Sequence, residues 1–454
     1  MTCNIIILAA GKGSRMYSDT PKVLHKLAGK PMLGHVIDTA QALSPQQVVV
    51  VYGHGGDQVQ REMAVYEGLD WAEQAEQLGT GHAVQQALPK IVPADVSLVL
   101  YGDVPLIKAQ TLQALLDQAA SGALAVLSVE PESPAGYGRI VKDSSGVVTA
   151  IVEEKDASDA QKAIREVNTG VMAIPGAHIE QWLGQLSNDN AQGEYYLTDL
   201  VAMASEQGVG VTSVVCADEN EVAGVNNKVQ LAALERHYQR QTAQDLLLAG
   251  ATLADPNRID VRGQLQVGRD VSIDVGCVFE GNVTLADGVR IGPYCQIRDS
   301  DIASGAQIEA YSSIDRASIG QAATVGPYAR LREGTVLAEN SKVGNFVETK
   351  KTHLGKGSKA NHLSYIGDAE VGEAVNIGAG TITCNYDGVN KFKTTIGDRA
   401  FIGSNSSLVA PIDIGEGATV GAGSTVSKEA PEQQLTIGRA KQVTIRNWKR
   451  PEKK

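Results

Sequence analysis

The stretch IGQAATVGPYARLREGTVLAENSKVGNFVETK, Ile319–Lys350, decides the fold of the second half of the chain. An aliphatic or small residue recurs at every sixth position, from Ile319 through Leu331 to Thr349. A period of six is typical of a β-helix in which three hexapeptides make one triangular coil and the recurring residue points inward. The stretch therefore predicts a parallel β-helix rather than a globular core.

The same period extends well beyond this stretch. It begins at Val267, ends at Val426 and covers 27 positions, which corresponds to nine coils. At about 4.8 Å per coil, we expect a prism about 43 Å tall. Solenoids of the known hexapeptide proteins are left-handed, and we expect that hand here. One longer gap, between Thr383 and Ile396, predicts a loop on one face.

The first half has a different pattern. Apolar runs at Ile5–Ala10, Val48–Gly53 and Val96–Asp103 alternate with helix-like stretches. Continuous apolar runs suit parallel strands that helices cover on both faces. We therefore expect a Rossmann-like α/β domain with a mostly parallel sheet and with ligands at the carboxyl ends of its strands.

A helix is expected between the two halves. Residues 227–249 contain neither proline nor glycine, and Gly250 is a plausible stop. We expect domains at 1–228 and 250–454, joined by a linker helix at 229–249. The alternative is that this helix packs as the last element of the first domain.

Composition limits the class of protein. The chain has 454 residues, of which 43% are hydrophobic and 48 are glycine, so wholesale disorder is excluded. A net charge of −12 provides no global basic field for nucleic acid. The five cysteines form no CxxC pair, and no apolar run is long enough for a membrane span. We expect a soluble cytoplasmic protein without nucleic-acid partners or membrane insertion.

Two cysteines fall within the repeat. Cys277 and Cys295 each lie four residues after an inward aliphatic residue, at the small inward position of a hexapeptide. We therefore expect both in the core of the prism.

The motif LAAGKGSRM, Leu8–Met16, follows the first apolar run. A strand that enters a glycine-rich turn offers backbone N–H groups to phosphates. The motif is neither a Walker A loop nor a dinucleotide fingerprint. Arg15 and Lys22 could neutralise a triphosphate, and the alternative is that they are two surface cations beside a turn.

Asp103 ends the strand-like run VSLVLYGD. A carboxylate at the carboxyl end of a buried strand is a good Mg²⁺ ligand, although Asp also favours helix N-caps. Three further segments, residues 77–83, 136–140 and 167–170, place polar residues beside glycine and could recognise sugar hydroxyls and base edges.

The repeat places two cations one coil apart. Arg332 and Lys350 each follow an inward residue and are separated by 18 positions, so they should stack about 4.8 Å apart on one face. Like charges at that distance favour an anion between them, such as a sugar phosphate. Two solvated surface cations are the alternative.

Only two histidines, His353 and His362, lie in the repeat half. Histidine suits the role of a general base near neutral pH, so these two are the candidate bases of this half. His353 falls four residues after Thr349, at the inward position, which indicates a structural role. His362 falls just past a corner and can face solvent.

Together these features resemble known families. Residues 1 to about 228 are similar to the sugar-nucleotide pyrophosphorylases. With the repeat half included, the chain resembles the family of bifunctional bacterial N-acetylglucosamine-1-phosphate uridylyltransferases and glucosamine-1-phosphate N-acetyltransferases. The segments that carry this likeness are AEQLGTGHA, NDNAQGEYYLTD, EVAGVNN, VGNFVETKK, SYIGD and NIGAGTITCNYDG.

The resemblance implies two sets of site residues. The nucleotide and its sugar would be bound by Leu8, Ala9, Ala10, Gly11, Arg15, Lys22, Gln74, Gly79, Thr80, Tyr101, Gly102, Asp103, Gly138, Glu153, Asn168 and Asn226, with Mg²⁺ on Asp103 and Asn226. In the prism, His362 would be the base, with Arg332, Lys350, Tyr365 and Asn376 at the sugar phosphate, and Ala379, Asn385, Tyr386, Ser404, Ala422 and Arg439 at acetyl-CoA. Helix capping is the alternative role for Asn226.

The resemblance also implies a reaction sequence. Glucosamine 1-phosphate is acetylated first, and uridylyl transfer from UTP then gives UDP-N-acetylglucosamine for peptidoglycan and lipopolysaccharide precursors. A homotrimer is implied as well. The basic segment 439–454 is either a solvated tail or a cover over the anionic coenzyme. The alternative functions are a uridylyltransferase whose β-helix serves only assembly, and a nucleotide-sugar sensor without catalysis.

Overall fold

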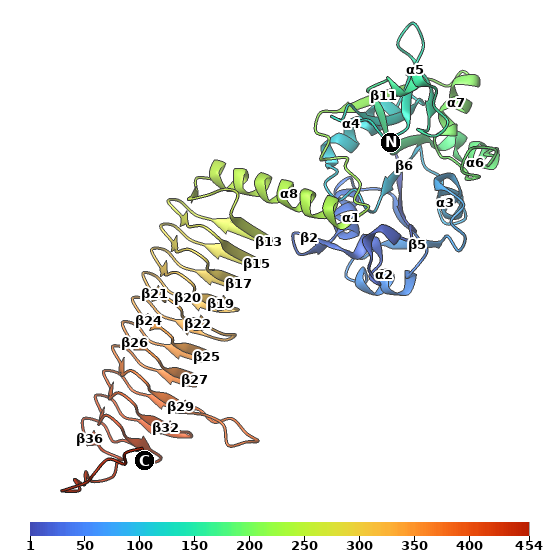
Figure 1. The fold of residues 1–454 in the computed structure, drawn as a ribbon. Helices are drawn as coiled ribbons and strands as arrows, with labels where there is room; N and C mark the ends of the chain where they lie inside the picture. Colours follow the sequence, from blue (N-terminus) through green and yellow to red (C-terminus); the bar gives the residue numbers. More distant parts are fainter. Residues whose placement is uncertain (454) are drawn as a thin grey trace. The chain divides into compact units, whose positions relative to one another are not determined.

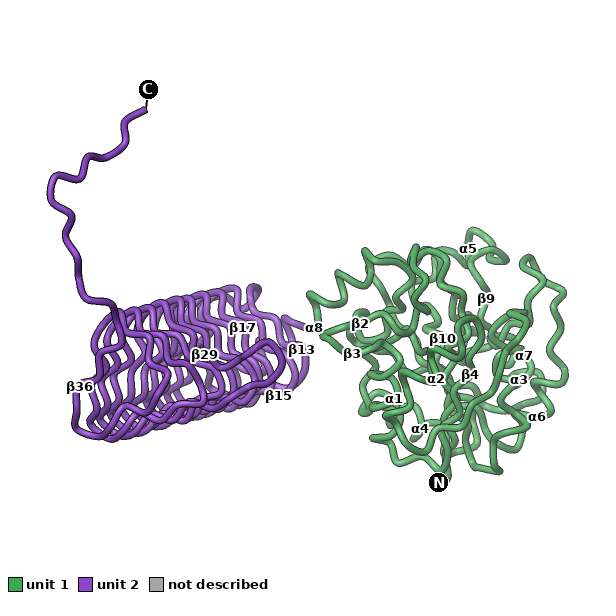
Figure 2. The backbone as a smooth tube through the Cα atoms, turned by 90° about the horizontal axis from the view of Figure 1, so that it is seen from below, with its two compact units in different colours: residues 1–238 green, residues 239–454 purple. Residues whose placement is uncertain are grey.

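The computed structural model describes residues 1–453; Lys454, the last residue of the expected basic tail, lies outside the described residues. The chain forms two compact units, residues 1–238 and 239–454 (Figure 2). The boundary falls within helix α8 (Lys228–Leu248). Leu234 of this helix joins an apolar cluster of the first unit, and Leu246 joins the core of the second.

A twisted sheet forms the centre of the first unit. Its main strands run in the order β11-β7-β10-β6-β1-β4-β5, and every pairing along this path is parallel except those of β10. These strands are β1 (Cys3–Ala9), β4 (Gln47–Tyr52), β5 (Leu69–Glu73), β6 (Val96–Tyr101), β7 (Leu124–Val129), β10 (Val167–Pro175) and β11 (Val211–Cys216). The α/β prediction is confirmed.

Helices cover both faces of this sheet, as the continuous apolar strands require. Ile5 and Ile7 pack into the cluster that contains helices α1 and α4, whereas Ile6 packs into the cluster that contains α3, α6 and α7. The helices are α1 (Met32–Ala42), α2 (Gly56–Glu62), α3 (Thr80–Ala87), α4 (Ala109–Ala119), α5 (Asp159–Lys162), α6 (Gly176–Gly184) and α7 (Asp199–Glu206). A hairpin of β8 (Arg139–Lys142) and β9 (Val148–Val152) pairs with β10.

The second unit is a parallel β-helix of the left-handed hexapeptide type, seen as a regular stack of coils in Figure 1. One ladder holds eleven short strands: β12 (Thr252–Leu253), β14 (Ser272–Ile273), β16 (Arg290–Ile291), β18 (Gln307–Ile308), β21 (Thr324–Val325), β24 (Lys342–Asn345), β26 (Lys359–His362), β28 (Asn376–Ile377), β31 (Phe401–Ile402), β34 (Thr419–Val420) and β36 (Leu435–Thr436).

A second ladder covers the rest of the prism, because several of its strands continue around a corner. Its main strands are β13 (Ile259–Val267), β15 (Cys277–Leu285), β17 (Gln296–Ile302), β19 (Ser313–Asp315), β22 (Arg330–Leu331), β25 (Glu348–Leu354), β27 (Tyr365–Val371), β29 (Ile382–Cys384), β32 (Ser407–Val409) and β35 (Thr425–Val426). The branches are β20 (Ser318–Ile319), β23 (Val336–Leu337), β30 (Thr394–Ile396) and β33 (Ile412–Ile414).

The inward positions of the repeat form one continuous core. Leu331, Val343 and Ile366 are fully buried, and Cys277 and Cys295 are buried beside them, as expected. The nine-coil estimate was too short, because eleven strands stack on one face. Coils outside Val267–Val426 were missed because Leu253 and Thr436 are only partly buried, and so constrain the sequence less.

A glycine follows many of the inward residues of the repeat, as Gly292 follows Ile291. Gly292 does not adopt a positive φ. A Cβ at this position would lie 2.8 Å from the backbone nitrogen of Ala310 in the next coil. The close approach of neighbouring coils therefore excludes a side chain here. Several corners instead carry aromatic residues at positive φ, and the rings of Tyr311 and Tyr328 stack with centroids 4.9 Å apart.

The register of the prism predicts unequal costs for two neighbouring substitutions. On β23, Leu337 is 1% exposed whereas Val336 is 43% exposed. Leu337→Ala should lower the free energy of unfolding by about 2–5 kcal/mol, because it leaves a cavity between coils. Val336→Ala, the matched control, should cost no more than about 0.5 kcal/mol. Denaturant unfolding followed by circular dichroism measures both, and equal losses would contradict the inward register.

Candidate active sites

A cavity of about 230 Å³ opens at the carboxyl ends of β1, β5 and β6. Leu8 of β1 pairs with Tyr101 of β6, so the glycine-rich turn and Asp103 leave the sheet side by side. The backbone N–H of Gly102 donates to Leu8 O at 2.9 Å and closes this junction. The cavity brings together ten of the expected nucleotide residues: Leu8, Ala9, Ala10, Gly11, Lys22, Gln74, Gly79, Thr80, Tyr101 and Asp103.

A polar cluster lies at the edge of this cavity. The Lys22 ammonium contacts the Asp103 carboxylate and lies 3.3 Å from Asn226 Oδ1. Arg15 donates to the same Asn226 oxygen at 3.0 Å. Four of the expected residues, distant in sequence, therefore meet at one point.

Neither Asp103 nor Asn226 uses its side-chain oxygen to cap a helix. The helix that follows Asp103, α4, begins only at Ala109. Helix α8 begins at Lys228, so Asn226 does not open it, and Asn227 accepts the capping hydrogen bond from the Gln230 N–H at 2.9 Å. The side chain of Asn226 is thereby left to face Lys22 and Arg15.

The residues of this cluster suit a divalent cation. Asp103 and Asn226 supply one carboxylate and one amide oxygen, which are hard ligands of the kind that Mg²⁺ prefers. Both oxygens already converge on one positive charge, the Lys22 ammonium. The side chains of Lys22 and Asp103 are 13% and 16% exposed, so a ligand can still reach them. The donor set fits a metal whose remaining ligands are waters and phosphate oxygens.

The expected sugar residues form a second group on β10 and the β8–β9 hairpin. The Asn168 N–H donates to Gly138 O at 2.8 Å, and a Cβ on Gly138 would lie 3.3 Å from Glu153 Oε1. Burial raises the pKa of Glu153, although Thr198 donates to its carboxylate at 3.3 Å.

Asn168 Oδ1 accepts a hydrogen bond from the Gly170 N–H, which fixes the turn beside the Tyr101 ring. Tyr101 therefore links this second group to the cavity, whereas Gly138, Glu153 and Asn168 do not line it. Four cavity residues were not among those named individually for the nucleotide: Val23, Gln77, Ala83 and Glu194, of which Gln77 and Ala83 lie in the expected segment 77–83. Gln77 and Glu194 lie in polar segments that contain glycine, and this pattern could have indicated that they contact a ligand.

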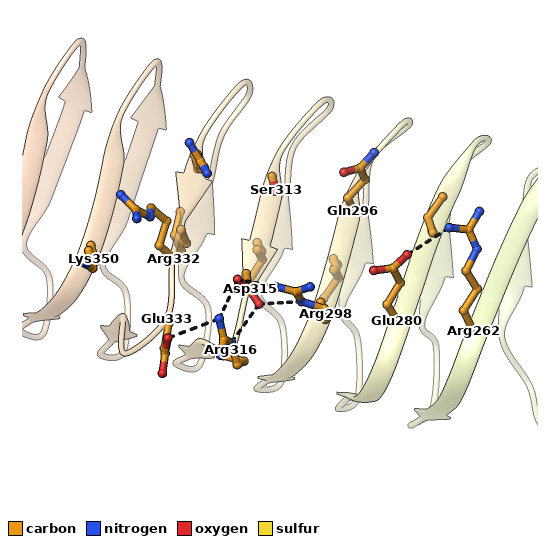
Figure 3. Close-up of a pocket in the computed structure, with 15 residues that line it drawn as sticks. Arg262, Glu280, Gln296, Arg298, Ser313, Asp315, Arg316, Arg332, Glu333 and Lys350 are labelled. Carbon is orange, nitrogen blue, oxygen red and sulfur yellow. Dashed lines mark hydrogen bonds and ion pairs between the residues drawn. The ribbon is translucent and has the colours of Figure 1, made fainter. Parts of the chain in front are cut away.

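The prism carries a separate cavity of about 490 Å³ along one face. Arg332 and Lys350 lie on neighbouring coils of this face (Figure 3), because Leu331 pairs with Thr349. Glu348 accepts a hydrogen bond from Arg332 at 2.8 Å, so a carboxylate of the protein lies beside this cation. The Lys391 ammonium, on the inserted loop, lowers the pKa of Lys350, and Arg332 adds to this effect.

His362 is exposed at a corner of the prism with one ring nitrogen held. Its Nδ1 lies 2.7 Å from Asn345 Oδ1, one coil away on the paired strand β24. An amide oxygen only accepts, so Nδ1 carries the hydrogen and Nε2 keeps its lone pair. Asn345 was missed, although it lies in the quoted VGNFVETKK segment.

The expected inward position of His353 was wrong. Its side chain is 44% exposed, and Nδ1 lies 2.6 Å from Glu370 Oε1. Thr352 is the buried residue instead, because the next inward residue, Leu354, follows Thr349 by five positions rather than six. Counting four positions from Thr349 therefore places the ring on the wrong side of the strand.

The expected acetyl-CoA residues lie along successive coils. The N–H of Asn405 donates to Ala379 O, that of Gly423 donates to Ser404 O, and the Arg439 guanidinium contacts Ala422 O. This column continues from His362, whose carbonyl accepts a hydrogen bond from Gly380 N–H at 3.3 Å.

Tyr365 and Asn385 form another group. A Cβ on Gly367 would meet the Tyr365 hydroxyl and the Asn385 amide. Tyr386 is exposed on the inserted loop. Asn376 lies on β28 and pairs with Lys359, at the opposite end of β26 from His362. His362, Tyr365 and Asn376 do not line the cavity of Arg332 and Lys350, although Tyr365 pairs with Glu348, which accepts the hydrogen bond from Arg332.

Comparisons with known proteins agree with this division. A family model described as a MobA-like NTP transferase domain matches residues 5–170. Models of the GMPPB C-terminal domain and of the hexapeptide repeat of succinyl-transferase match residues 261–354 and 393–428.

Curated relatives cover the whole chain. The protein named bifunctional protein GlmU from Cupriavidus pinatubonensis is 58% identical over 451 residues, with 99% of both chains covered. The proteins of that name from Ralstonia pickettii and Stutzerimonas stutzeri are 59% identical with 99% of both chains covered, and 56% identical with 100% of both covered. The chain therefore belongs to the family of bifunctional GlmU proteins.

Proposed function

We propose that the two sites work in succession, with acetyl transfer in the prism followed by uridylyl transfer in the α/β unit. Membership of the family gives the chain both transferase activities for the synthesis of UDP-N-acetylglucosamine. The assignment of residues rests chiefly on one observation: Lys22, Asp103 and Asn226 meet at the edge of a cavity at the carboxyl ends of the strands.

In the α/β unit, the reaction is an in-line displacement. An oxygen of the sugar 1-phosphate attacks the α-phosphorus of UTP, the bond to the β-phosphate oxygen breaks, and pyrophosphate leaves. Both reactants are anions, so the site must hold them close and reduce their repulsion. Lys22 and Arg15 supply positive charge, and the glycine-rich turn supplies backbone N–H groups.

Asp103 and Asn226 would hold Mg²⁺ in this site. When bound, the metal supplies further charge neutralisation at the phosphate oxygens. The expected sugar residues, Gly138, Glu153 and Asn168, would bind the hydroxyl and acetamido groups of the sugar.

In the prism, His362 is the proposed base. Its Nδ1–H is held by Asn345, so Nε2 can take the proton that leaves the amine of glucosamine 1-phosphate as the new amide bond forms. The thiol of coenzyme A is the leaving group. Arg332 and Lys350, with Tyr365 and Asn376, would hold the sugar phosphate, and the column that ends at Arg439 would hold acetyl-CoA.

The alternative functions fit less well. A uridylyltransferase whose β-helix served only assembly would need neither an oriented His362 nor the Arg332 and Lys350 pair. A sensor without catalysis would need no Lys22 beside Asp103. The cytoplasm is the proposed location, because UTP and acetyl-CoA are made there and the five cysteines are free thiols. No helix within residues 1–453 has the length and apolarity needed to cross a membrane.

Asp103→Asn should separate the two activities. Loss of the carboxylate should lower pyrophosphate release at least about 100-fold, because a metal ligand contributes several kcal/mol of charge stabilisation. Thiol release from acetyl-CoA should be unchanged. The control is Asp117→Asn, an exposed carboxylate on α4. Equal loss of both activities in Asp103→Asn would contradict two independent sites.

His362→Ala should have the opposite effect. Removal of a general base should lower thiol release by about 10²–10⁴-fold and leave pyrophosphate release intact. His353→Ala is the control, because that ring lies on a different face and pairs with Glu370. Full acetylation by His362→Ala would show that another group is the base.

The scattered prism residues support a site shared between chains of a homotrimer. We expect His362→Ala and Arg439→Ala chains, each weak alone, to complement each other when mixed, denatured and refolded together. Some acetyl sites in the mixed trimers would then contain both wild-type residues. Thiol release that never exceeds that of the parents, although mixed trimers form, would exclude a shared site.

A further inference from the structure

A chain of three polar side chains leads away from the nucleotide cavity. Gln74, which follows β5, lines the cavity and is only 3% exposed. Its Nε2 lies 3.1 Å from Nδ1 of His82, on helix α3. The other ring nitrogen, Nε2, lies 3.0 Å from Nε2 of the Gln86 side-chain amide, one turn further along the helix. His82 and Gln86 do not line the cavity themselves.

The Gln74 amide has only one possible orientation. Its Nε2 also lies 3.1 Å from Gly79 O, and a carbonyl oxygen only accepts hydrogen bonds. The amide nitrogen must therefore face Gly79, and its two hydrogens go to Gly79 O and His82 Nδ1. Among residues 1–453, no donor contacts the remaining Gln74 Oε1. Gln74 can thus offer a ligand only an acceptor.

This arrangement also defines the tautomer of His82. Nδ1 accepts a hydrogen from Gln74, so the neutral ring carries its own hydrogen on Nε2. Gly79 O keeps the Gln74 amide from turning, so it is the Gln86 amide, whose nitrogen faces the ring in the structure, that must turn its oxygen to accept this hydrogen. The Tyr195 ring packs nearby, with its centroid 6.3 Å from that of His82. Tyr195 is itself tied to the neighbouring turn, because its carbonyl accepts a hydrogen bond from the Gly81 N–H at 2.8 Å.

We propose that His82 is a positioning residue that makes the site select uracil over cytosine by locking the Gln74 amide. This inference rests on the proposed nucleotide site. Uracil has an N–H at N3 that can donate a hydrogen bond to Gln74 Oε1. Cytosine has a lone pair at N3, which the same oxygen repels. Without His82 Nδ1, one amide hydrogen of Gln74 loses its partner, only Gly79 O still holds the amide, and the cost of turning its nitrogen to the base falls. The site then accepts cytosine more readily.

The test compares UTP with CTP in pyrophosphate release by the full chain. His82→Leu should raise KM for UTP with little change in kcat, and should reduce the UTP-to-CTP ratio of kcat/KM about tenfold, the equivalent of one hydrogen bond. His82→Asn should retain most of the ratio, because its amide oxygen can accept the hydrogen of Gln74. Gln86→Met should reduce the ratio less, by freeing the ring to change tautomer. KM for the sugar phosphate and the rate of thiol release should stay constant in all three.

The outcomes distinguish the inference from the proposed function. A wild-type enzyme that uses CTP as well as UTP would overturn the assignment of the base site itself. A wild-type preference for UTP that survives in both His82→Leu and Gln86→Met would overturn the role of His82 alone. If His82→Leu does not fold, Gln86→Met decides, because its side chain lies outside the cavity. An equal fall of the UTP-to-CTP ratio of kcat/KM in His82→Leu and His82→Asn would also contradict the proposal that His82 fixes the orientation of the Gln74 amide.

Discussion

Each coil of the prism can bury its inward side chains only against the coils above and below it. This constraint determines the rest of the second unit. Inward Leu331 must lie over Thr349, so outward Arg332 must lie beside Lys350. By the same rule Val343 lies over Ala360, which brings Asn345 to His362. Two residues that lie 17 positions apart in the sequence thus become the proposed base and the group that holds its ring.

The α/β unit also brings together residues that are distant in the sequence, but it does so through the edge of a parallel sheet. Buried parallel strands place their carboxyl ends along one edge, where the turns after β1 and β6 meet. The polar cluster also needs Asn226, which arrives from the segment before α8 rather than from the sheet. Asp103 balances only the charge of Lys22, and Arg15 contacts the neutral Asn226 amide, so a net positive charge remains for an anionic ligand. The site is therefore preorganised for anions.

Much of this could be predicted from the sequence, because periodicity reports directly on burial. The period of six predicted the prism, the core cysteines and the position of Arg332 and Lys350 on neighbouring coils of one face. Periodicity failed where the step changed from six to five, and His353 was misplaced for that reason. It also failed at the ends of the solenoid, where partly buried Leu253 and Thr436 are less constrained. The antiparallel β10 and the contact of His82 with Gln74 depend on tertiary packing, which no local pattern records.

The inserted loop leaves the coils on either side undisturbed. Before it, Cys384 pairs with Val409, and after it, Ile396 pairs with Val371 and Ile414, in the same ladder. The chain thus leaves the stack at Cys384 and rejoins it by Thr394 with the ladder unbroken. In evolutionary terms, such a site can be lengthened, shortened or exchanged without cost to the core. Changes in substrate preference can accumulate there while the scaffold stays constant.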